Sequence, residues 1–381
     1  MAINQDILNE LVDGLGWILK KDDVFMIQTK QRITWIDMAK GYGMLGVILA
    51  HLDVGILGTW IYTFHMPLFF LLSGYVFSAK DDFSTFMKKK CKSMLIPYFC
   101  LGIPMLLLDG FGNYIVGTYT IQDCVFLMLR FLIQRRMLTL WFLACLFFLN
   151  IFFYVALKIL KTNMKLAILS IITAIVGLIY YRIGGIALPW NIDVCLMAFP
   201  FFFIGYFYKE NHDNIDKYLN DIKISIGLFV ILGISNLVCG YLTIKISGAS
   251  LEMFRSSYGF APLTYLSAFA GGVCVIIVSK WITIKPIQYI GENSLLYFAW
   301  HQTIMIPISS ICLSLIHITL NERSSLLNIG IYKALQLIIV VIALTICNII
   351  ITRTRLKFIL GKAYIPEKYG TRGKKQCQMK M

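Results

Sequence analysis

The sequence predicts an all-α, polytopic membrane protein with about ten transmembrane helices. Of its 381 residues, 58% are apolar and only 14% are charged, whereas soluble globular domains are about half apolar and about a quarter charged. Mean hydropathy is +0.74. Long apolar runs recur along the chain, and a run of about 17–25 residues is what a helix needs to cross a bilayer. A lipid bilayer is therefore the expected surrounding for most of this chain.

The apolar runs place the predicted transmembrane helices in order. They lie at about 36–54, 60–79, 93–109, 138–157, 166–181, 191–208, 224–243, 258–279, 291–316 and 330–352. A further amphipathic stretch near 121–134 is too short to cross a bilayer, because a helix rises only about 1.5 Å per residue. We expect this stretch to lie at the membrane interface or to re-enter the membrane.

The basic residues indicate an orientation. Ten spans leave both termini on one side, and 27 of the 35 Lys and Arg residues fall on that side against 8 on the other. Because Lys and Arg collect in cytoplasmic loops, we expect both termini to be cytoplasmic. The same asymmetry accounts for the net charge of +15, so nucleic acid is not needed as a partner.

The chain divides into three predicted regions. Residues 1–34 lack the pattern of a signal peptide, and we expect a cytoplasmic amphipathic helix on the membrane surface or on the body of the protein. Residues 35–352 form one membrane-embedded domain of ten spans, and residues 353–381 form a basic cytoplasmic tail. The ten cysteines have no C-x-x-C spacing. We therefore expect no disulfide framework and no metal site.

The first predicted span carries Asp37, Lys40 and His51. Eleven residues separate Lys40 from His51, which places both on one face of a helix and about 16 Å apart along its axis. A deep histidine suits a general base, and a cytoplasmic lysine suits a phosphorylated cofactor. Two plainer interpretations stay open. Lys40 would reach the headgroups, and His51 would bond to a backbone carbonyl.

Further polar side chains lie in or beside other spans, where ionisable groups are costly and point to function. Lys88, Lys89, Lys90 and Lys92 suit either anionic headgroups or the phosphates of a cofactor. His65 and Trp141 also fit the membrane interface, where such residues are common. The remaining candidates in these clusters are Ser73, Arg135, Arg136, Asn293 and His301. We expect His301 near mid-depth, where it could face the same cavity as His51.

These clusters together resemble the acyltransferase-3 family of membrane acyltransferases, and in particular its polysaccharide and sugar O-acetylases. The first span matches a basic residue, ten intervening residues and a histidine. Similar motifs follow in order at 35–41 (W-I-D-M-A-K-G), 64–74 (F-H-M-P-L-F-F-L-L-S-G), 140–143 (L-W-F-L), 200–206 (P-F-F-F-I-G-Y) and 291–295 (G-E-N-S-L) with His301 after it. Many relatives carry two arginines after the second span, where this chain has lysines and Ser93. Lysine lacks the bidentate guanidinium fork, so this loop departs from those relatives at the position expected to bind the donor.

The resemblance implies transfer of an acyl group, usually acetyl, from cytosolic acetyl-CoA to a hydroxyl of a cell-envelope polysaccharide or its lipid-linked precursor. It further implies a place in the bacterial cytoplasmic membrane. His51 would act as general base or as transient acyl carrier, with Asp37 and Lys40 positioning the donor and Lys89, Lys90 and Lys92 near its phosphates. The acceptor would meet His65, Ser73, Arg135, Arg136, Trp141, Asn293 and His301.

Two other classes of function remain compatible with the sequence. Ten spans with scattered polar groups also suit an exporter or flippase for a polysaccharide or its precursor, although the paired halves of many transporters are not visible in this sequence. The second class is a membrane sensing module without catalysis, and the Lys40–His51 pair argues against this class. The sequence leaves open the acceptor, the acyl group, the oligomeric state and the role of residues 1–34.

Overall fold

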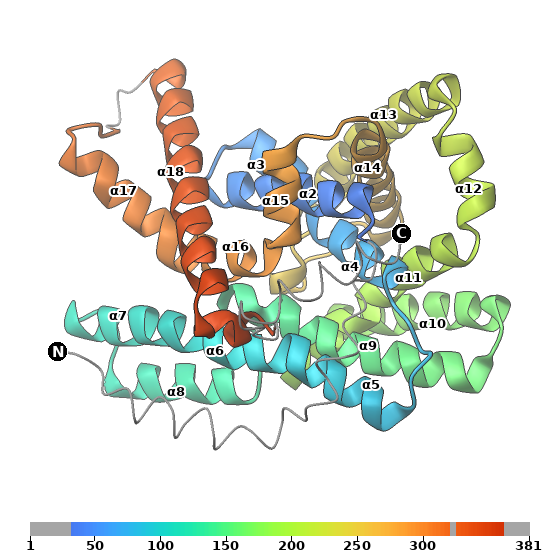
Figure 1. Cartoon of the computed structure of the whole chain (residues 1–381), viewed down its shortest axis with the longest axis horizontal. Helices are drawn as coiled ribbons and strands as arrows, with labels where there is room; N and C mark the ends of the chain where they lie inside the picture. The colour runs from blue at the N-terminus through green and yellow to red at the C-terminus, as the bar shows by residue number, and fades with distance from the viewer. Residues whose placement is uncertain (1–31, 321–324, 362–381) are drawn as a thin grey trace, which may run out of the picture. The chain divides into compact units, whose positions relative to one another are not determined.

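The structure is a computed structural model, and it describes residues 32–320 and 325–361. The chain divides into two units, one formed by Met1–Ile33 with Ala363–Met381 and the other by Thr34–Lys362. The second unit carries the helices of Figure 1. The amphipathic helix predicted for residues 1–34, and most of the predicted basic tail, lie outside the described residues.

The prediction of an all-α polytopic membrane protein is confirmed. Nine helical stretches within the described residues are long and apolar enough to cross a membrane. They are Ile56–Tyr75, Phe83–Ile115, Leu138–Leu160, Asn163–Arg182, Pro189–Glu210, Ile222–Ser247, Ala261–Trp281, Ser294–Leu315 and Leu326–Arg353. Each coincides with one of the predicted spans after the first. No β-strand occurs in the described residues, which contain a single isolated bridge between Glu252 and Ser257.

Several of the nine stretches are built from shorter pieces. The first is α3 (Ile56–Tyr62) followed by α4 (His65–Tyr75), and the second joins α5 (Phe83–Lys90), α6 (Ile96–Leu106) and α7 (Gly112–Ile115). The others are α9 (Trp141–Leu160), α10 (Asn163–Arg182), α11 (Ile192–Glu210), α13 (Ile222–Ser247), α14 (Ala261–Trp281), α16 (Ser294–Trp300) with α17 (Ile306–Leu315), and α18 (Leu326–Arg353). Shorter helices α8 (Ile121–Leu132), α12 (His212–Leu219) and α15 (Lys285–Glu292) connect them.

The first predicted span corresponds to helix α2 (Thr34–His51), which is not among those nine. Its polar residues Asp37, Lys40 and His51 lower its hydropathy. The helix contacts α3, α4, α14, α15 and α16. Because neighbouring helices surround α2 (Figure 1), most of its residues meet protein, and the helix does not need an apolar surface all round.

The amphipathic stretch near 121–134 forms α8, a helix of 12 residues that is not one of the candidate spans. Thr120 and Asp123 form a capping box at its start, in which each side chain bonds to the backbone of the other. Leu127 and Phe131 are buried against the protein, while Val125, Phe126 and Leu129 on its other side are exposed. The apolar outer face suits contact with lipid.

In the part of the chain that the structure describes, three π-helical turns interrupt the spans, at η3 (Cys91–Leu95), η4 (Leu107–Phe111) and η8 (His301–Met305). Two of them precede a proline, at Pro97 and Pro307. A proline has no N–H to give to the carbonyl four residues earlier, and that carbonyl lies inside η3 or η8. The missing bond favours the wider turn. In η8 this places His301 at the junction between α16 and the π turn.

Two pairs of helices pack backbone against backbone at glycines. A Cβ atom at Gly291 on α15 would overlap the backbone oxygen of Asp37 on α2, and one at Gly41 would overlap that of Ile287. The same relation joins α4 and α11, where Gly74 meets Phe202 and Gly205 meets Leu71. Small residues permit this close approach of membrane helices. At Gly41 on α2, the backbone that approaches is that of α15.

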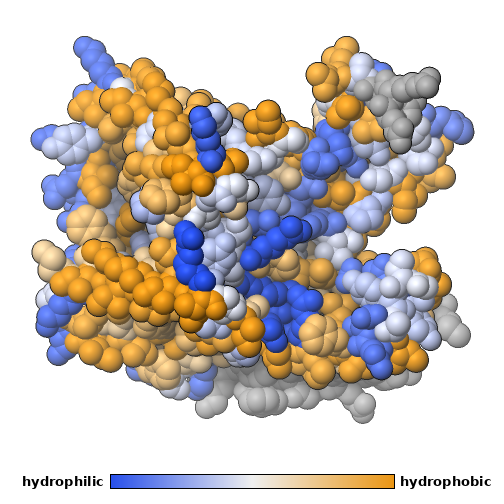
Figure 2. Space-filling view, turned by 180° about the vertical axis from the view of Figure 1, so that it is seen from behind, coloured by the Kyte–Doolittle hydropathy of each residue, from blue (hydrophilic) through white to orange (hydrophobic). Residues whose placement is uncertain are grey.

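The outer faces of several helices are apolar. Exposed branched residues recur along α10 (Ile168, Ile171, Ile172, Ile175), α13 (Val230, Ile231, Ile234, Leu237) and α18 (Ile338, Ile342, Ile346, Ile350). Figure 2 shows apolar side chains over much of one face, with hydrophilic residues gathered in the recess between them. A soluble protein rarely exposes so much contiguous apolar surface, and a bilayer would cover it.

Candidate functional site

His51 and His301 meet in the interior of the protein. His51 ends α2, His301 follows α16, and their rings lie 4.9 Å apart between centroids at 75°. Nδ1 of His51 is 3.4 Å from Nε2 of His301, a contact across 250 residues of sequence. His301 is fully buried and His51 is partly buried. The structure thus brings together two of the histidines that the sequence singled out.

The backbone around each ring determines where its proton lies. Nδ1 of His301 is 3.0 Å from the carbonyl oxygens of Tyr297 and Phe298. A carbonyl oxygen can only accept a hydrogen bond, so we assign the proton of neutral His301 to Nδ1. Its Nε2 then carries the lone pair, and it is this atom that faces His51.

The same reasoning assigns the tautomer of His51. Its Nδ1 lies 2.8 Å from the carbonyl oxygen of Val47 and 3.4 Å from the lone pair of His301. Both partners accept, so Nδ1 of His51 must donate, shared between the two. The remaining nitrogen, Nε2, is left with its lone pair. A neutral imidazole with an unprotonated Nε2, held in one orientation by its Nδ1–H, is what a general base requires.

Tyr62 and His65 extend this cluster. The ring centroid of Tyr62 lies 5.7 Å from that of His51 and 4.9 Å from that of His65. His65 is buried at the start of α4, with its Nδ1 3.0 Å from the carbonyl oxygen of Ile61. By the same argument its Nε2 carries the lone pair. His65, which the sequence analysis expected to meet the acceptor, is therefore separated from His51 by the ring of Tyr62.

A polar cavity opens at the C-terminal end of α2, next to this cluster. It has a volume of about 220 Å³ and is lined by Ala50, Asp53, Val54, Gly55, Gly58, Thr59, Tyr62, Ser250, Glu252 and Arg255. Two segments supply these residues, the 50–62 segment from α2 to α3 and the α13–α14 loop, residues 248–260. Arg255 and Glu252 form an ion pair at 3.2 Å. Sequence analysis did not single out Asp53, Glu252 or Arg255 as site residues.

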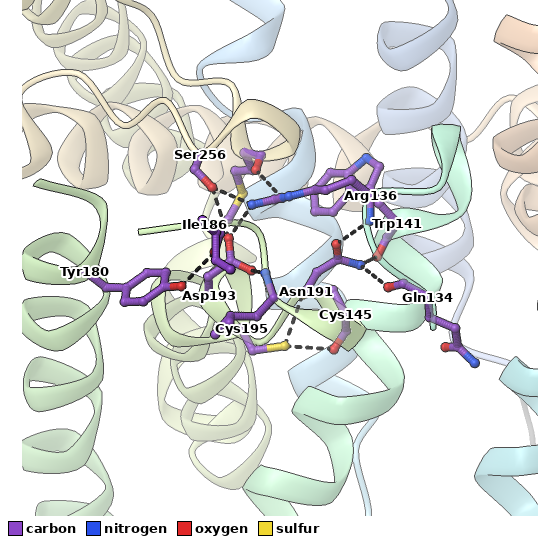
Figure 3. A network of polar contacts seen from close by, with 12 residues as sticks. Gln134, Arg136, Trp141, Cys145, Tyr180, Ile186, Asn191, Asp193, Cys195 and Ser256 are labelled. Carbon is purple, nitrogen blue, oxygen red and sulfur yellow. Dashed lines mark hydrogen bonds and ion pairs between the residues drawn. The ribbon is translucent and has the colours of Figure 1, made fainter. Parts of the chain in front are cut away.

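Arg136, expected to contact the acceptor, lies in a buried polar network (Figure 3). Its guanidinium forms an ion pair with Asp193, at the start of α11, and donates to Ser256 and to the carbonyl oxygen of Met253, at 3.0 Å for the last. Its backbone N–H donates to Asn191 at 3.0 Å. The guanidinium thus ties α11 to the α13–α14 loop.

Residues close to Arg136 are also buried or hydrogen-bonded to other parts of the protein. The side-chain amide of Asn191 donates to the carbonyl oxygen of Trp141 at 2.9 Å, as Figure 3 shows. Trp141, expected near the acceptor, is buried. Arg135 is half-buried, and its carbonyl oxygen accepts from Arg130 at 3.4 Å. On the α13–α14 loop, Tyr258 is buried, and this burial raises the pKa of its hydroxyl.

The expected donor residues lie at the other end of α2 and on α5. Asp37 is buried where α2 meets α15, and Lys40 is half-buried one turn later. Asn293, expected to meet the acceptor, follows α15, the helix that packs against this end of α2, and donates to the carbonyl oxygen of Tyr289 at 2.9 Å. Lys89 is exposed and pairs with Asp81 at 2.9 Å. Lys90, at the end of α5, lies above the ring of Phe86. Lys92 is half-buried in η3, which follows α5. Ser73, expected to meet the acceptor, lies on α4 and donates to the carbonyl oxygen of Phe69 at 2.7 Å.

Within the described chain, no three His, Cys or acidic side chains lie close enough together to hold a metal ion. The side chains at the histidine cluster offer chemistry of their own. They supply an imidazole whose Nε2 can accept a proton, a second imidazole in contact with it, and a polar cavity beside both.

Fold and site together define a polytopic membrane protein with two imidazole rings in contact in its interior, beside a polar cavity. The profile of the acyltransferase-3 family, described as an acyltransferase domain, matches residues 33–353. Because this match covers most of the chain, the protein belongs to that family and is a membrane acyltransferase. No curated protein and no solved structure matches the chain.

Proposed function

We propose that this membrane acyltransferase transfers an acetyl group from cytosolic acetyl-CoA to a hydroxyl of a cell-envelope polysaccharide or its lipid-linked precursor. The observation that carries the proposal is the assigned tautomer of His51, whose Nδ1–H is held by Val47 and His301 and whose Nε2 has a lone pair. An alcohol needs such a base to become a nucleophile at neutral pH. The resemblance to sugar O-acetylases supports the choice of donor and acceptor.

The proposed reaction proceeds through His51. Its Nε2 takes the proton of the acceptor hydroxyl as the hydroxyl oxygen attacks the thioester carbonyl carbon. A C–O bond forms, the C–S bond breaks, and the imidazolium returns the proton to the departing thiolate. The products are an ester and free CoA thiol. When His51 is protonated, the Nε2 lone pair of His301 accepts from its Nδ1–H, which stabilises the charge that develops in the transition state.

The orientation follows from the distribution of charge. With the N-terminal end of α2 at the cytoplasmic side, the lysine-rich segments face the cytosol in agreement with the positive-inside rule. Lys40 then lies at the donor entrance, and the polar cavity lies on the far side of the histidine pair. The donor thioester would approach His51 from one side and the acceptor hydroxyl from the other. The proposed location is the bacterial cytoplasmic membrane, which the resemblance to polysaccharide O-acetylases supports.

The test is the O-acetyl content of surface glycan in cells that carry His51→Ala in place of the wild type. We expect the ester to fall to the level of a deletion strain, at an unchanged amount of membrane-inserted protein. His212→Ala is the matched control, because His212 is exposed on α12 and pairs with Asp213. A His51→Ala strain with full O-acetylation would overturn the proposal.

The base and the acyl-carrier roles of His51 use the same lone pair, so a second measurement separates them. Purified protein is mixed with isotope-labelled acetyl-CoA without acceptor, quenched in acid-free buffer and analysed by mass spectrometry. We propose the base role, which predicts no label on His51. A labelled His51 peptide would assign the carrier role instead.

A further inference from the structure

We propose that the polar cavity at the C-terminal end of α2 is the acceptor site, and that it takes a sugar unit without negative charge, either neutral or amine-bearing. The inference rests on the proposed acyl transfer and adds the chemical class of the acceptor. The cavity holds about 220 Å³, far more than the roughly 10–15 Å³ that a single water needs. It therefore has room for more than an ordered water.

The position of the cavity fits an acceptor. Ala50, which lines it, precedes His51 in α2, and Tyr62, which also lines it, contacts the His51 ring. A hydroxyl of a ligand in this cavity would lie next to the histidine pair. Of the two ends of α2, this is the end away from Asp37 and Lys40, so a ligand here would not compete with a donor that enters near Lys40.

The lining suits hydroxyl groups. Asp53 and Glu252 supply carboxylates that accept hydrogen bonds, and Arg255 supplies a guanidinium that donates them. Thr59 and Tyr62 add hydroxyls that can do either. A sugar presents hydroxyls that both donate and accept at close spacing, so it can satisfy such a mixed set. A purely apolar ligand would leave these groups without partners, at a cost for each.

The charge of the lining selects among sugars. Its ionisable side chains are the two carboxylates and the one guanidinium, so the wall carries one net negative charge. Arg255 is 74% exposed and pairs with Glu252, and this pair offsets its charge. A phosphate or carboxylate on the acceptor would face the carboxylate of Asp53 and be repelled. An amine would be attracted, and an uncharged ring would be accepted.

The α13–α14 loop, which carries Glu252 and Arg255, is held in place by hydrogen bonds on the side away from the cavity. Glu252 and Ser257 exchange backbone hydrogen bonds at 2.8 and 3.0 Å, and Arg136 binds Met253 and Ser256 on the same loop. Binding sites are more selective when the backbone behind them is fixed. Arg136 is thus a positioning residue for the acceptor cavity, acting through the α13–α14 loop.

The experiment uses the purified full-length protein in lipid nanodiscs with labelled acetyl-CoA and three trisaccharide probes at equal concentration. The probes are triacetylchitotriose, which is neutral, chitotriose at mildly acidic pH, which is cationic, and trigalacturonic acid, which is anionic. We expect the wild type to acetylate the neutral and cationic probes at least tenfold faster than the anionic one. Glu252→Gln and Asp53→Asn should each lower the cationic-to-anionic ratio at least fivefold.

Asp53→Asn is a suitable second variant, because Asp53 has a positive φ of 54° and asparagine also tolerates this conformation. Glu210→Gln, an exposed carboxylate at the end of α11, removes the same charge away from the cavity and should leave the ratio unchanged. An anionic probe acetylated as fast as the others, or an unchanged ratio in both cavity variants, would overturn the inference. So would a failure to acetylate any probe while His51-dependent hydrolysis of acetyl-CoA continues. If wild-type protein shows no His51-dependent use of acetyl-CoA, the proposed function itself fails.

Discussion

His301 holds His51 in the tautomer that leaves Nε2 free to accept a proton. The two rings come from segments 250 residues apart, and Nε2 of His301 lies 3.4 Å from Nδ1 of His51. His301 is fixed in turn by two carbonyl oxygens at 3.0 Å. A carbonyl oxygen can only accept, so Nδ1–H of His301 donates to its two carbonyl oxygens. Nδ1–H of His51 in turn donates to Val47 and to Nε2 of His301. We therefore propose that His301 positions His51.

This relation predicts the effect of changing His301. Leucine in its place cannot accept from His51, whereas the side-chain oxygen of glutamine can. We expect His301→Leu to lower kcat about 10–100-fold, by analogy with the range found for groups that orient metal-binding histidines. His301→Gln should retain more activity than His301→Leu. Acetyl-CoA turnover by purified protein measures both. Equal losses in the two variants, at equal thermal stability, would show that the accepted hydrogen bond does not matter.

The close helix contacts predict a stability effect. Gly205→Ala would push a Cβ into the backbone of Leu71, and overpacking of this kind costs about 1–3 kcal/mol. Gly233→Ala on α13 is the control, because nothing lies within 4 Å of its added Cβ, and alanine there should be neutral or stabilising. Thermal unfolding in detergent compares the two. A Gly205→Ala protein as stable as Gly233→Ala would contradict the contact.

Much of the fold follows from the sequence because lipid imposes a strict length and polarity on each span. The nine apolar helices appear as nine apolar runs, and α8 as a run that is too short. The sequence also points to His51, since a histidine in a span is costly. Its contact with His301 could be expected only in outline, because depth in the membrane does not fix which faces of two helices meet.

The acceptor cavity could not be found in the same way. Glu252 and Arg255 lie in a loop, where polar residues are ordinary and have no periodicity to interpret. Arg136 attracts attention in the sequence as one of two adjacent arginines, but its partner Asp193 is 57 residues away. Only the folded chain shows that its guanidinium is engaged by α11 and the α13–α14 loop. A polar side chain near a site can thus hold the backbone of that site in place without contacting the ligand.

The donor side of the proposal predicts a change in KM. If the ammonium of Lys40 binds the phosphates of acetyl-CoA equally in the ground and transition states, Lys40→Met raises the KM for acetyl-CoA several-fold with little change in kcat. Lys165→Met, at an exposed position in the first turn of α10, is the control and should change neither value. An unchanged KM in Lys40→Met would favour contact between Lys40 and lipid headgroups, as its plainer interpretation has it.

The buried ion pair of Arg136 and Asp193 predicts both a loss of stability and a specific kinetic change. Asp193→Asn leaves the Arg136 charge without its buried partner, which costs about 3–5 kcal/mol in comparable pairs. Arg136→Lys keeps the charge but loses the fork that reaches Asp193, Ser256 and Met253 together. We expect the lysine variant to be the more stable of the two.

The kinetic part separates positioning from general support. Because Arg136 holds the loop that carries Glu252 and Arg255, Arg136→Lys should raise the KM for a trisaccharide acceptor at least fivefold while the KM for acetyl-CoA stays within about twofold. The control is Arg182→Lys, at an exposed position at the end of α10. Equal increases in both KM values would mean that Arg136 supports the whole fold and has no particular connection to the acceptor cavity.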